Sequence, residues 1–166
     1  MDYFQDDLTM LFPLFNRKQE NCIDWVGTTL TGPWQAENIG ETSISGAEFR
    51  ATGTWRSLSA SFKHTYMNSD EKGGYISKYA LRFPEHQSSL SVRNIFGANM
   101  YVSVQMVYKK RTDQDDYFLV SGMFAKQYKE YEFFIKGTNL FDREYEDIPG
   151  IPQPGRWLGI GCAWKQ

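Results

Sequence analysis

The sequence has little imbalance of charge. Its 18 lysines and arginines are nearly matched by 20 aspartates and glutamates, so the formal net charge is -2 over 166 residues. A nucleic-acid-binding protein usually carries a basic face or stripe, and a polybasic or acidic tail would form a run of one sign. The charges here are dispersed along the chain, and we predict no nucleic-acid partner.

Cysteine and histidine are also scarce. The two cysteines, Cys22 and Cys162, lie near opposite ends of the chain and match no metal-binding or redox spacing. Neither His64 nor His86 has a metal-ligand partner at a typical spacing or a neighbouring nucleophile motif. The sequence therefore indicates no catalytic residue, metal site or cofactor, and we predict that the protein is not an enzyme.

Long hydrophobic runs are missing as well. No window approaches the roughly 18 consecutive apolar residues of a membrane-spanning helix, which excludes a helical membrane protein. The N-terminus, MDYFQDDLTMLFPLF, is acidic and has no small-residue cleavage site, so it does not resemble a secretory signal. Either the protein stays in the cytoplasm, or Met1 is not the natural start of its gene product.

The pattern that is present has a period of two residues. In the segment 98–108, Met100, Val102, Val104, Met106 and Tyr108 fall on one face and Tyr101, Ser103 and Gln105 on the other, which is typical of a strand. The same alternation, with breaks at Gly, Pro, Asn and Asp, predicts eight strands. They cover about 8–26, 34–55, 57–68, 86–96, 98–112, 115–127, 130–143 and 156–165.

The connections between these strands alternate in length. Tight links fall near Arg56, Gly97 and Lys129, and wider ones cover 27–33, 69–85 and 144–155. Short periplasmic turns and longer extracellular loops are typical of an outer-membrane barrel. We therefore predict an all-β fold, an antiparallel up-and-down transmembrane β-barrel segment of about eight strands.

A barrel also accounts for an unusual composition. The chain has 12 Phe, 10 Tyr and 5 Trp, yet its mean hydropathy is only -0.53. A barrel wall needs apolar side chains only on alternate positions, and rings gather in girdles at the membrane interfaces. Candidate girdle residues are Tyr66, Tyr108, Tyr128, Tyr131 and Trp164. A soluble barrel or sandwich with these positions in its core is the alternative, although inward Ser, Gln, Lys and Arg would make a poor dry core.

Specific motifs lie in the C-terminal third. NLFDREYE at 139–146 and GIPQPGR at 150–156, followed by an amphipathic strand, resemble the end of the TonB-dependent receptor family. Earlier segments resemble the same family in the same order, namely IDWV at 23–26, WQAENIGE at 34–41, ISGAEFRA at 44–51, YISKYAL at 75–81 and PEHQSSLSV at 84–92. The resemblance covers nearly the whole chain.

The resemblance implies a location and an activity. These receptors are outer-membrane transporters of Gram-negative bacteria, with about 22 strands around a plugged lumen. We expect residues 1–166 to be a C-terminal barrel segment whose signal peptide, plug domain and N-terminal strands are absent. By resemblance, the partners are outer-membrane lipid and TonB, the latter through the missing N-terminal regions. The cargo is a metal chelate such as a ferric siderophore, or cobalamin.

Two sets of residues are candidates for function. The family-motif positions have structural roles at the last corner: Asn139, Leu140, Phe141, Asp142, Tyr145, Pro154, Gly155 and Arg156. Asn and Asp can bond their own backbone in turns, and Gly permits a bend. Loop residues that could contact a ligand or lipopolysaccharide are Trp34, Tyr75, Tyr79, Arg82 and Tyr145, with ordinary loop surface as the alternative for them.

Two further alternatives remain open at this point. One is a self-closed eight-stranded outer-membrane barrel with a structural or adhesive role, in which inward Glu48, Arg50, Arg93, Tyr101 and Lys136 would pair as a polar core. The other is a soluble, lipocalin-like carrier of a small ligand, which requires the enclosed face to be the apolar one. The acidic runs at 113–116 and 144–147 are typical of solvated loops.

Overall fold

The computed structural model describes residues 7–29, 32–69, 74–79, 83–97, 99–111, 114–148 and 150–164. Within these ranges, ten strands form one antiparallel sheet and two more form a small hairpin. No helix in this part of the chain is long and apolar enough to cross a membrane. The strands are β1 (Asp7–Leu11), β2 (Leu14–Gly27), β3 (Gln35–Trp55), β4 (Leu58–Ser69), β5 (Ile76–Ser77), β6 (His86–Phe96), β7 (Met100–Arg111), β8 (Gln114–Tyr128), β9 (Tyr131–Thr138), β10 (Glu146–Ile148), β11 (Ile151–Pro152) and β12 (Trp157–Trp164).

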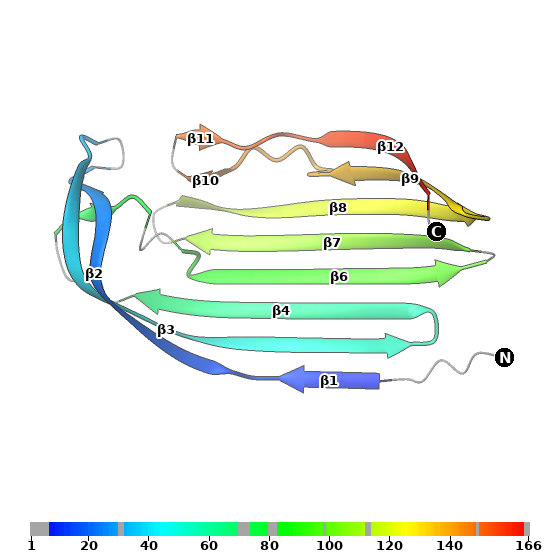
Figure 1. Cartoon of the computed structure of the whole chain (residues 1–166), viewed down its shortest axis with the longest axis horizontal. Coiled ribbons are helices and arrows are strands. Elements are labelled where there is room, and N and C mark those ends of the chain that lie inside the picture. Colours follow the sequence, from blue (N-terminus) through cyan, green and yellow to red (C-terminus); the bar gives the residue numbers. More distant parts are fainter. Residues whose placement is uncertain are drawn as a thin grey trace.

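The sheet is an up-and-down meander. Its order is β12-β9-β8-β7-β6-β4-β3-β2-β5, and β1 pairs with β3. Figure 1 shows the tight turns at one end and the longer connections, with β5, β10 and β11, at the other. Backbone φ angles of 52° at Arg56, 58° at Gly97 and 54° at Lys129 mark the predicted tight turns. The predicted all-β, antiparallel fold is confirmed.

The sheet does not close on itself. Among the described residues β12 pairs only with β9, and β1 and β2 lie at the opposite edge beside β3 (Figure 1). The self-closed eight-stranded barrel required the last strand to pair with the first, and this pairing is not present.

The two faces of the sheet differ as the alternation predicts. Cross-strand register aligns an apolar row through five neighbouring strands, composed of Ala51, Phe62, Leu90, Met106 and Val120. The adjacent positions form a polar row on the other face, composed of Thr52, Ser61, Ser91, Gln105 and Ser121. Because side chains alternate along a strand, each strand contributes to both faces.

Three strand boundaries differ from the predictions. The expected strand 8–26 is divided into β1 and β2 at Phe12–Pro13, because proline has no backbone N–H for the ladder. The expected strand 130–143 ends at Thr138, where Asn139 turns to a φ of 47°. The wide loops at 69–85 and 144–155 also contain short strands, β5 and the β10–β11 hairpin.

The long β2–β3 hairpin extends past the other strands and curves (Figure 1). Its ladder shifts register near Gln19 and Cys22, where Gly40 on the partner strand has a φ of 75°. Gly46 marks a close approach, since a Cβ there would collide with the carbonyl oxygen of Tyr66 and the ring of Phe15. Gly40 therefore lies at an irregularity of the ladder, and Gly46 lies where two strands and a ring approach closely.

Candidate functional site

The apolar face of the sheet is exposed over a broad area. Large side chains on β8, β9 and β12 protrude from it, with exposed fractions of 39% for Phe124, 58% for Ile135 and 85% for Ile160. The stretch of β8 from Phe118 to Tyr128 has the length of a membrane-crossing strand, about 9–11 residues. This face forms an apolar band of the height that a bilayer requires.

Aromatic rings border the band at both ends. At the tight-turn end, Tyr131 lies opposite both Tyr128 and Trp164 in the register. At the loop end, the rings of Tyr66 and His86 meet in a tilted arrangement with centroids 5.0 Å apart, and the ring of His64 shares a 2.8 Å hydrogen bond with the hydroxyl of Ser88. These rings lie near the strand ends, where the sequence predicts two girdles.

The last corner is held together by Asn139. Its side-chain nitrogen donates to the carbonyl oxygens of Arg143 (2.8 Å) and Pro154 (3.4 Å), and its oxygen accepts from the Arg143 N–H (2.9 Å). Asn139 is only 5% exposed, so these bonds satisfy a buried amide. The side chain joins the two halves of the family motif, NLFD and PGR.

Asp142 ties the same two halves from the other side. Its carboxylate accepts a 2.6 Å hydrogen bond from the backbone N–H of Arg156. A Cβ at Gly155 would lie 2.7 Å from that carboxylate oxygen, which explains why glycine occupies the position. Asn139, Asp142 and Gly155 thus contact one another's segments directly at this corner.

Leu140 covers a gap in the apolar face. Its backbone N–H donates to the carbonyl of Val120 (2.8 Å). A Cβ at Gly137 would lie 2.5 Å from a methyl group of Leu140, and one at Gly122 would lie 3.6 Å from the other. The leucine therefore fills the space that these two facing glycines leave, while the neighbouring Phe141 is 72% exposed.

Two of the predicted ligand-contacting residues lie together. The ammonium group of Lys78 lies over the rings of Trp34 and Tyr79, 5.3 and 5.4 Å from their centroids. Asp24 on β2 anchors this cluster, since its carboxylate accepts from the hydroxyl of Ser77 and from the backbone N–H of Tyr79. β5 pairs with the end of β2, which fixes the two loops side by side.

The other predicted loop residues are distributed differently. Tyr75 is half-buried beside β5, and Arg82 lies outside the described residues. Tyr145 belongs to the last loop, where its ring contacts Tyr117 of β8 in a tilted arrangement with centroids 4.7 Å apart. The five candidates therefore do not form one cluster in the described part of the structure.

Next to Tyr145 is a cluster that the sequence did not reveal. Asp147 accepts hydrogen bonds from Lys109 (3.0 Å), Arg111 (3.0 Å) and the hydroxyl of Tyr117 (2.6 Å). Partial burial alone would raise the pKa of the Asp147 carboxyl. The hydrogen bonds from Tyr117, Lys109 and Arg111 and the charge of Lys109 outweigh that effect, so the pKa of Asp147 lies below its ordinary value.

The carboxylate run 144–147 is typical of a solvated loop. The side chain of Asp147 is 38% exposed, and it also binds two cations on the polar face. A signal was available in the KKR run at 109–111, because Lys109 and Arg111 are two residues apart on a strand and share a face. Their partner comes from a distant loop, so the sequence did not pair them.

The rest of the polar face carries its charges in small groups. Glu48 lies 2.9 Å from both Arg50 and Lys63. The guanidinium of Arg93 lies 4.0 Å from the ring centroid of Tyr101. The side chains that the sequence placed on the inward face therefore find partners there, as a wet lumen wall allows.

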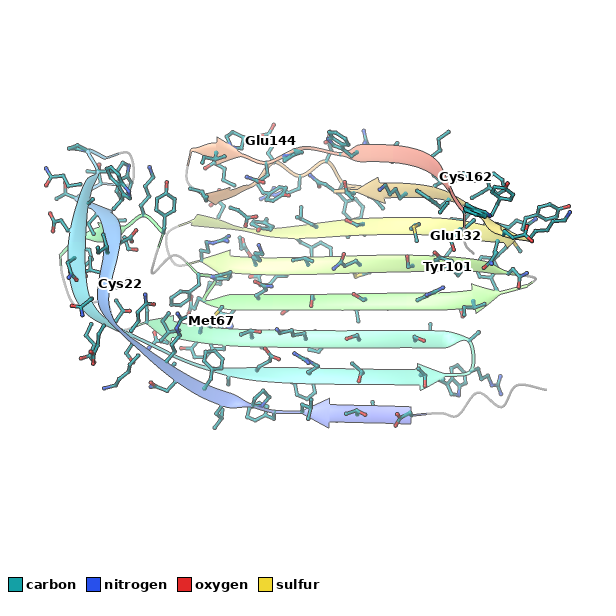
Figure 2. The ribbon with its side chains drawn as sticks, viewed as in Figure 1. Cys22, Met67, Tyr101, Glu132, Glu144 and Cys162 are labelled. Atoms are coloured by element: carbon teal, nitrogen blue, oxygen red, sulfur yellow. The ribbon has the colours of Figure 1, made fainter. Side chains whose placement is uncertain are left out.

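The two cysteines lie at opposite ends of the sheet (Figure 2), Cys22 buried in β2 and Cys162 exposed on β12, and both are free. Among the described residues no group of three or more His, Cys, Asp or Glu side chains could hold a metal ion. The clusters around Lys78 and Asp147 combine cations with aromatic rings, and this combination suits binding through charge and ring contacts.

A meander with an apolar band between aromatic borders, and a polar opposite face, defines the wall of a transmembrane β-barrel. A family profile described as "TonB dependent receptor-like, beta-barrel" matches residues 1–140. The chain belongs to this TonB-dependent receptor family.

A solved structure has the same fold. The ferric-catecholate import receptor Fiu from Escherichia coli K12, in its closed form, aligns with a TM-score of 0.69 at 17% identity. The alignment covers 93% of this chain and 25% of the Fiu chain, so this chain spans about a quarter of that receptor's length. A search of curated protein sequences found no significant match.

Proposed function

We propose that this chain is the C-terminal barrel segment of a TonB-dependent outer-membrane receptor that imports a scarce nutrient, with a ferric siderophore as the first candidate cargo. The plug domain, the remaining strands and the TonB-contacting region belong to the rest of the receptor. The observation that carries the proposal is the two-faced open sheet, whose apolar band and polar wall suit lipid on one side and a lumen on the other.

The energetics of the apolar face favour a lipid environment. Exposing apolar surface to water costs about 25 cal/mol per Å², and this face carries large side chains on every principal strand. Lipid removes that cost, while the polar face stays hydrated in a lumen. Barrels of this family reside in the outer membrane of Gram-negative bacteria, and we propose the same location for the receptor that carries this segment.

The choice of cargo follows from the comparison and from the loops. Fiu is described as a ferric-catecholate import receptor, and such chelates are anionic and rich in aromatic rings. The loop end of this chain offers cations beside rings, in the Lys78 cluster and around Lys109 and Tyr117. Cobalamin is the second candidate, and uptake measurements separate the two.

The test is an uptake experiment on the receptor that carries this segment. Cells lacking its gene are compared with complemented cells for uptake of radiolabelled ferric catecholate, ferric hydroxamate and cobalamin, with a TonB-deficient strain as a control. We expect the deletion to reduce ferric-catecholate uptake at least tenfold, and complementation to restore it only when TonB is present. Unchanged uptake of all three cargoes, or uptake independent of TonB, would refute the proposal.

A further inference from the structure

The cluster around Asp147 has the composition of an occupied binding site. Lys109 and Arg111 project from β7 on the polar face, and Tyr117 projects from the neighbouring β8. The side chains of Lys109 and Arg111 are only 21% and 11% exposed. Two cations and a phenol hydroxyl converge on a single carboxylate oxygen, Oδ1 of Asp147.

The cations are not fully matched by that carboxylate. Lys109 and Arg111 carry two positive charges, whereas Asp147 supplies one negative charge. The Nε of Arg111 is also buried and has no hydrogen-bond partner among the described residues. A buried guanidinium favours a partner with several oxygens, because its donors form a fixed fork. The site therefore has an excess of positive charge and an unused N–H donor, and both suit a ligand with more negative charge than one carboxylate.

The carboxylate comes from an element that is loosely attached. Asp147 lies on β10, which pairs with β11 and with no other described strand. Among the described residues, the Asp147 bonds and the tilted ring contact of Tyr145 with Tyr117 join the hairpin to the wall. Breaking this small set of contacts would release the hairpin and expose the cations.

We propose that Lys109, Arg111 and Tyr117 form an anion-binding site that Asp147 of the last loop occupies in this conformation, and that an incoming anionic ligand binds there by displacing the loop carboxylate. The loop acts as an internal competitor. A ligand can shift this equilibrium only by binding the open state more tightly than the closed one. The second positive charge and the unused Arg111 donor supply that difference.

The ligand class follows from the neighbouring rings, and this step depends on the proposed function. Once the hairpin moves, the part of the Tyr117 ring that Tyr145 contacts becomes available beside two cations. A chelate with several phenolate oxygens and aromatic rings, such as a ferric tris-catecholate, matches both features. A neutral chelate of similar size matches neither.

The test measures binding directly. Ferric tris-catecholate is titrated into the intact receptor that carries this segment, purified in detergent micelles, and the quenching of tyrosine and tryptophan fluorescence is followed, with a neutral ferric hydroxamate as the control ligand. Asp147→Asn removes the competitor and should tighten catecholate binding by about tenfold. Arg111→Gln removes the site and should weaken it by at least tenfold. Glu146→Gln removes one negative charge from the adjacent residue, as Asp147→Asn does at its own position, and should leave the affinity unchanged.

The outcomes separate a binding site from a purely structural ion pair. A structural pair predicts that Asp147→Asn leaves affinity unchanged or lowers it, and that result would overturn the proposal. Equal binding of the neutral hydroxamate, or full affinity in Arg111→Gln, would do the same. Because no TonB or transport is involved, loss of uptake with intact binding would refute the import function and leave the site standing.

Discussion

Asn139 is the residue on which the last corner most depends. It has a φ of 47°, a left-handed conformation that Asn tolerates better than most residues, and it ends β9. Its amide then bonds backbone groups on both sides of the loop, at Arg143 and Pro154. A single side chain thus ends one strand and orients the return to the next.

We expect Asn139→Asp to destabilise this corner by about 1–3 kcal/mol, because the carboxylate loses the donor to the Arg143 and Pro154 carbonyls and is buried near them. Urea unfolding of the chain in detergent micelles measures the change. Arg143→Ala is the matched control, since Asn139 contacts only the backbone of Arg143. Equal stability of the Asn139→Asp variant and the wild type would show that these bonds contribute little.

Asp147 makes attachment of the last loop depend on pH. The groups facing its carboxylate are Lys109 and Arg111 from β7 and Tyr117 from β8. The pKa of Asp147 lies below its ordinary value in the folded chain. The contribution of Asp147 to holding the loop is therefore complete above the unfolded pKa of about 3.9. This contribution is lost as the pH falls through the lower folded pKa.

The expected result is constant attachment from neutral pH down to about pH 4, and release of the hairpin only below it. A nitroxide label at Ile151→Cys, in a chain lacking the two native cysteines, reports mobility by electron paramagnetic resonance. The label should become mobile only under strongly acidic conditions. Asp147→Asn should be mobile at every pH, and release of the wild-type loop near neutral pH would contradict the assignment.

The sequence predicts some residue roles and not others for a physical reason. The turn roles of Asn139 and Asp142 follow from their residue types, since short polar side chains bond nearby backbone. The role of Asp147 does not, because a carboxylate in a loop is equally suited to water. Its partners lie on β7, and that proximity is a property of the folded sheet rather than of neighbouring sequence.

At the scale of strands, alternation is the reliable signal. β6 is found at His86–Phe96, the predicted range, and the faces assigned to 98–108 are those observed. The division at Pro13 was missed because the alternating pattern continues across it, although proline interrupts the ladder. The short strands β5, β10 and β11 are fixed by their partners, so their own sequences carry little signal.

The two faces of β7 give a matched pair of substitutions. Val104 lies on the apolar face and Gln105 beside it on the polar face. An arginine near the middle of the bilayer on the lipid face costs about 2–4 kcal/mol, whereas one facing the lumen is tolerated. We expect Val104→Arg to block insertion of the receptor into lipid vesicles and Gln105→Arg to insert normally, as measured by the mobility shift of folded barrels in electrophoresis. Equal insertion of both variants would mean that the faces are reversed or that neither contacts lipid.

At the scale of the whole molecule, the decisive feature is the unpaired edge. Lipid does not tolerate exposed backbone N–H and C=O groups, and β12 presents such groups on the side away from β9. Alternation predicts each strand but carries no information on what completes the sheet. The family explains the edge, since a barrel of about 22 strands needs further strands on both sides.

Hydrogen exchange along β12 tests this view of the molecule. In an antiparallel pair, successive residues direct their N–H groups to opposite sides of the strand. In the chain alone, every second amide from Trp157 to Trp164 should therefore exchange rapidly. The amides between them should be protected by their hydrogen bonds to β9. In the intact receptor both sets should be protected, because a further strand pairs with the free edge. The central strand β7, with partners on both sides, is the internal control and should be protected in both samples. Uniform protection of β12 in the chain alone would mean that its edge is already paired, by β1 or by a second copy, and the open-segment interpretation would be wrong.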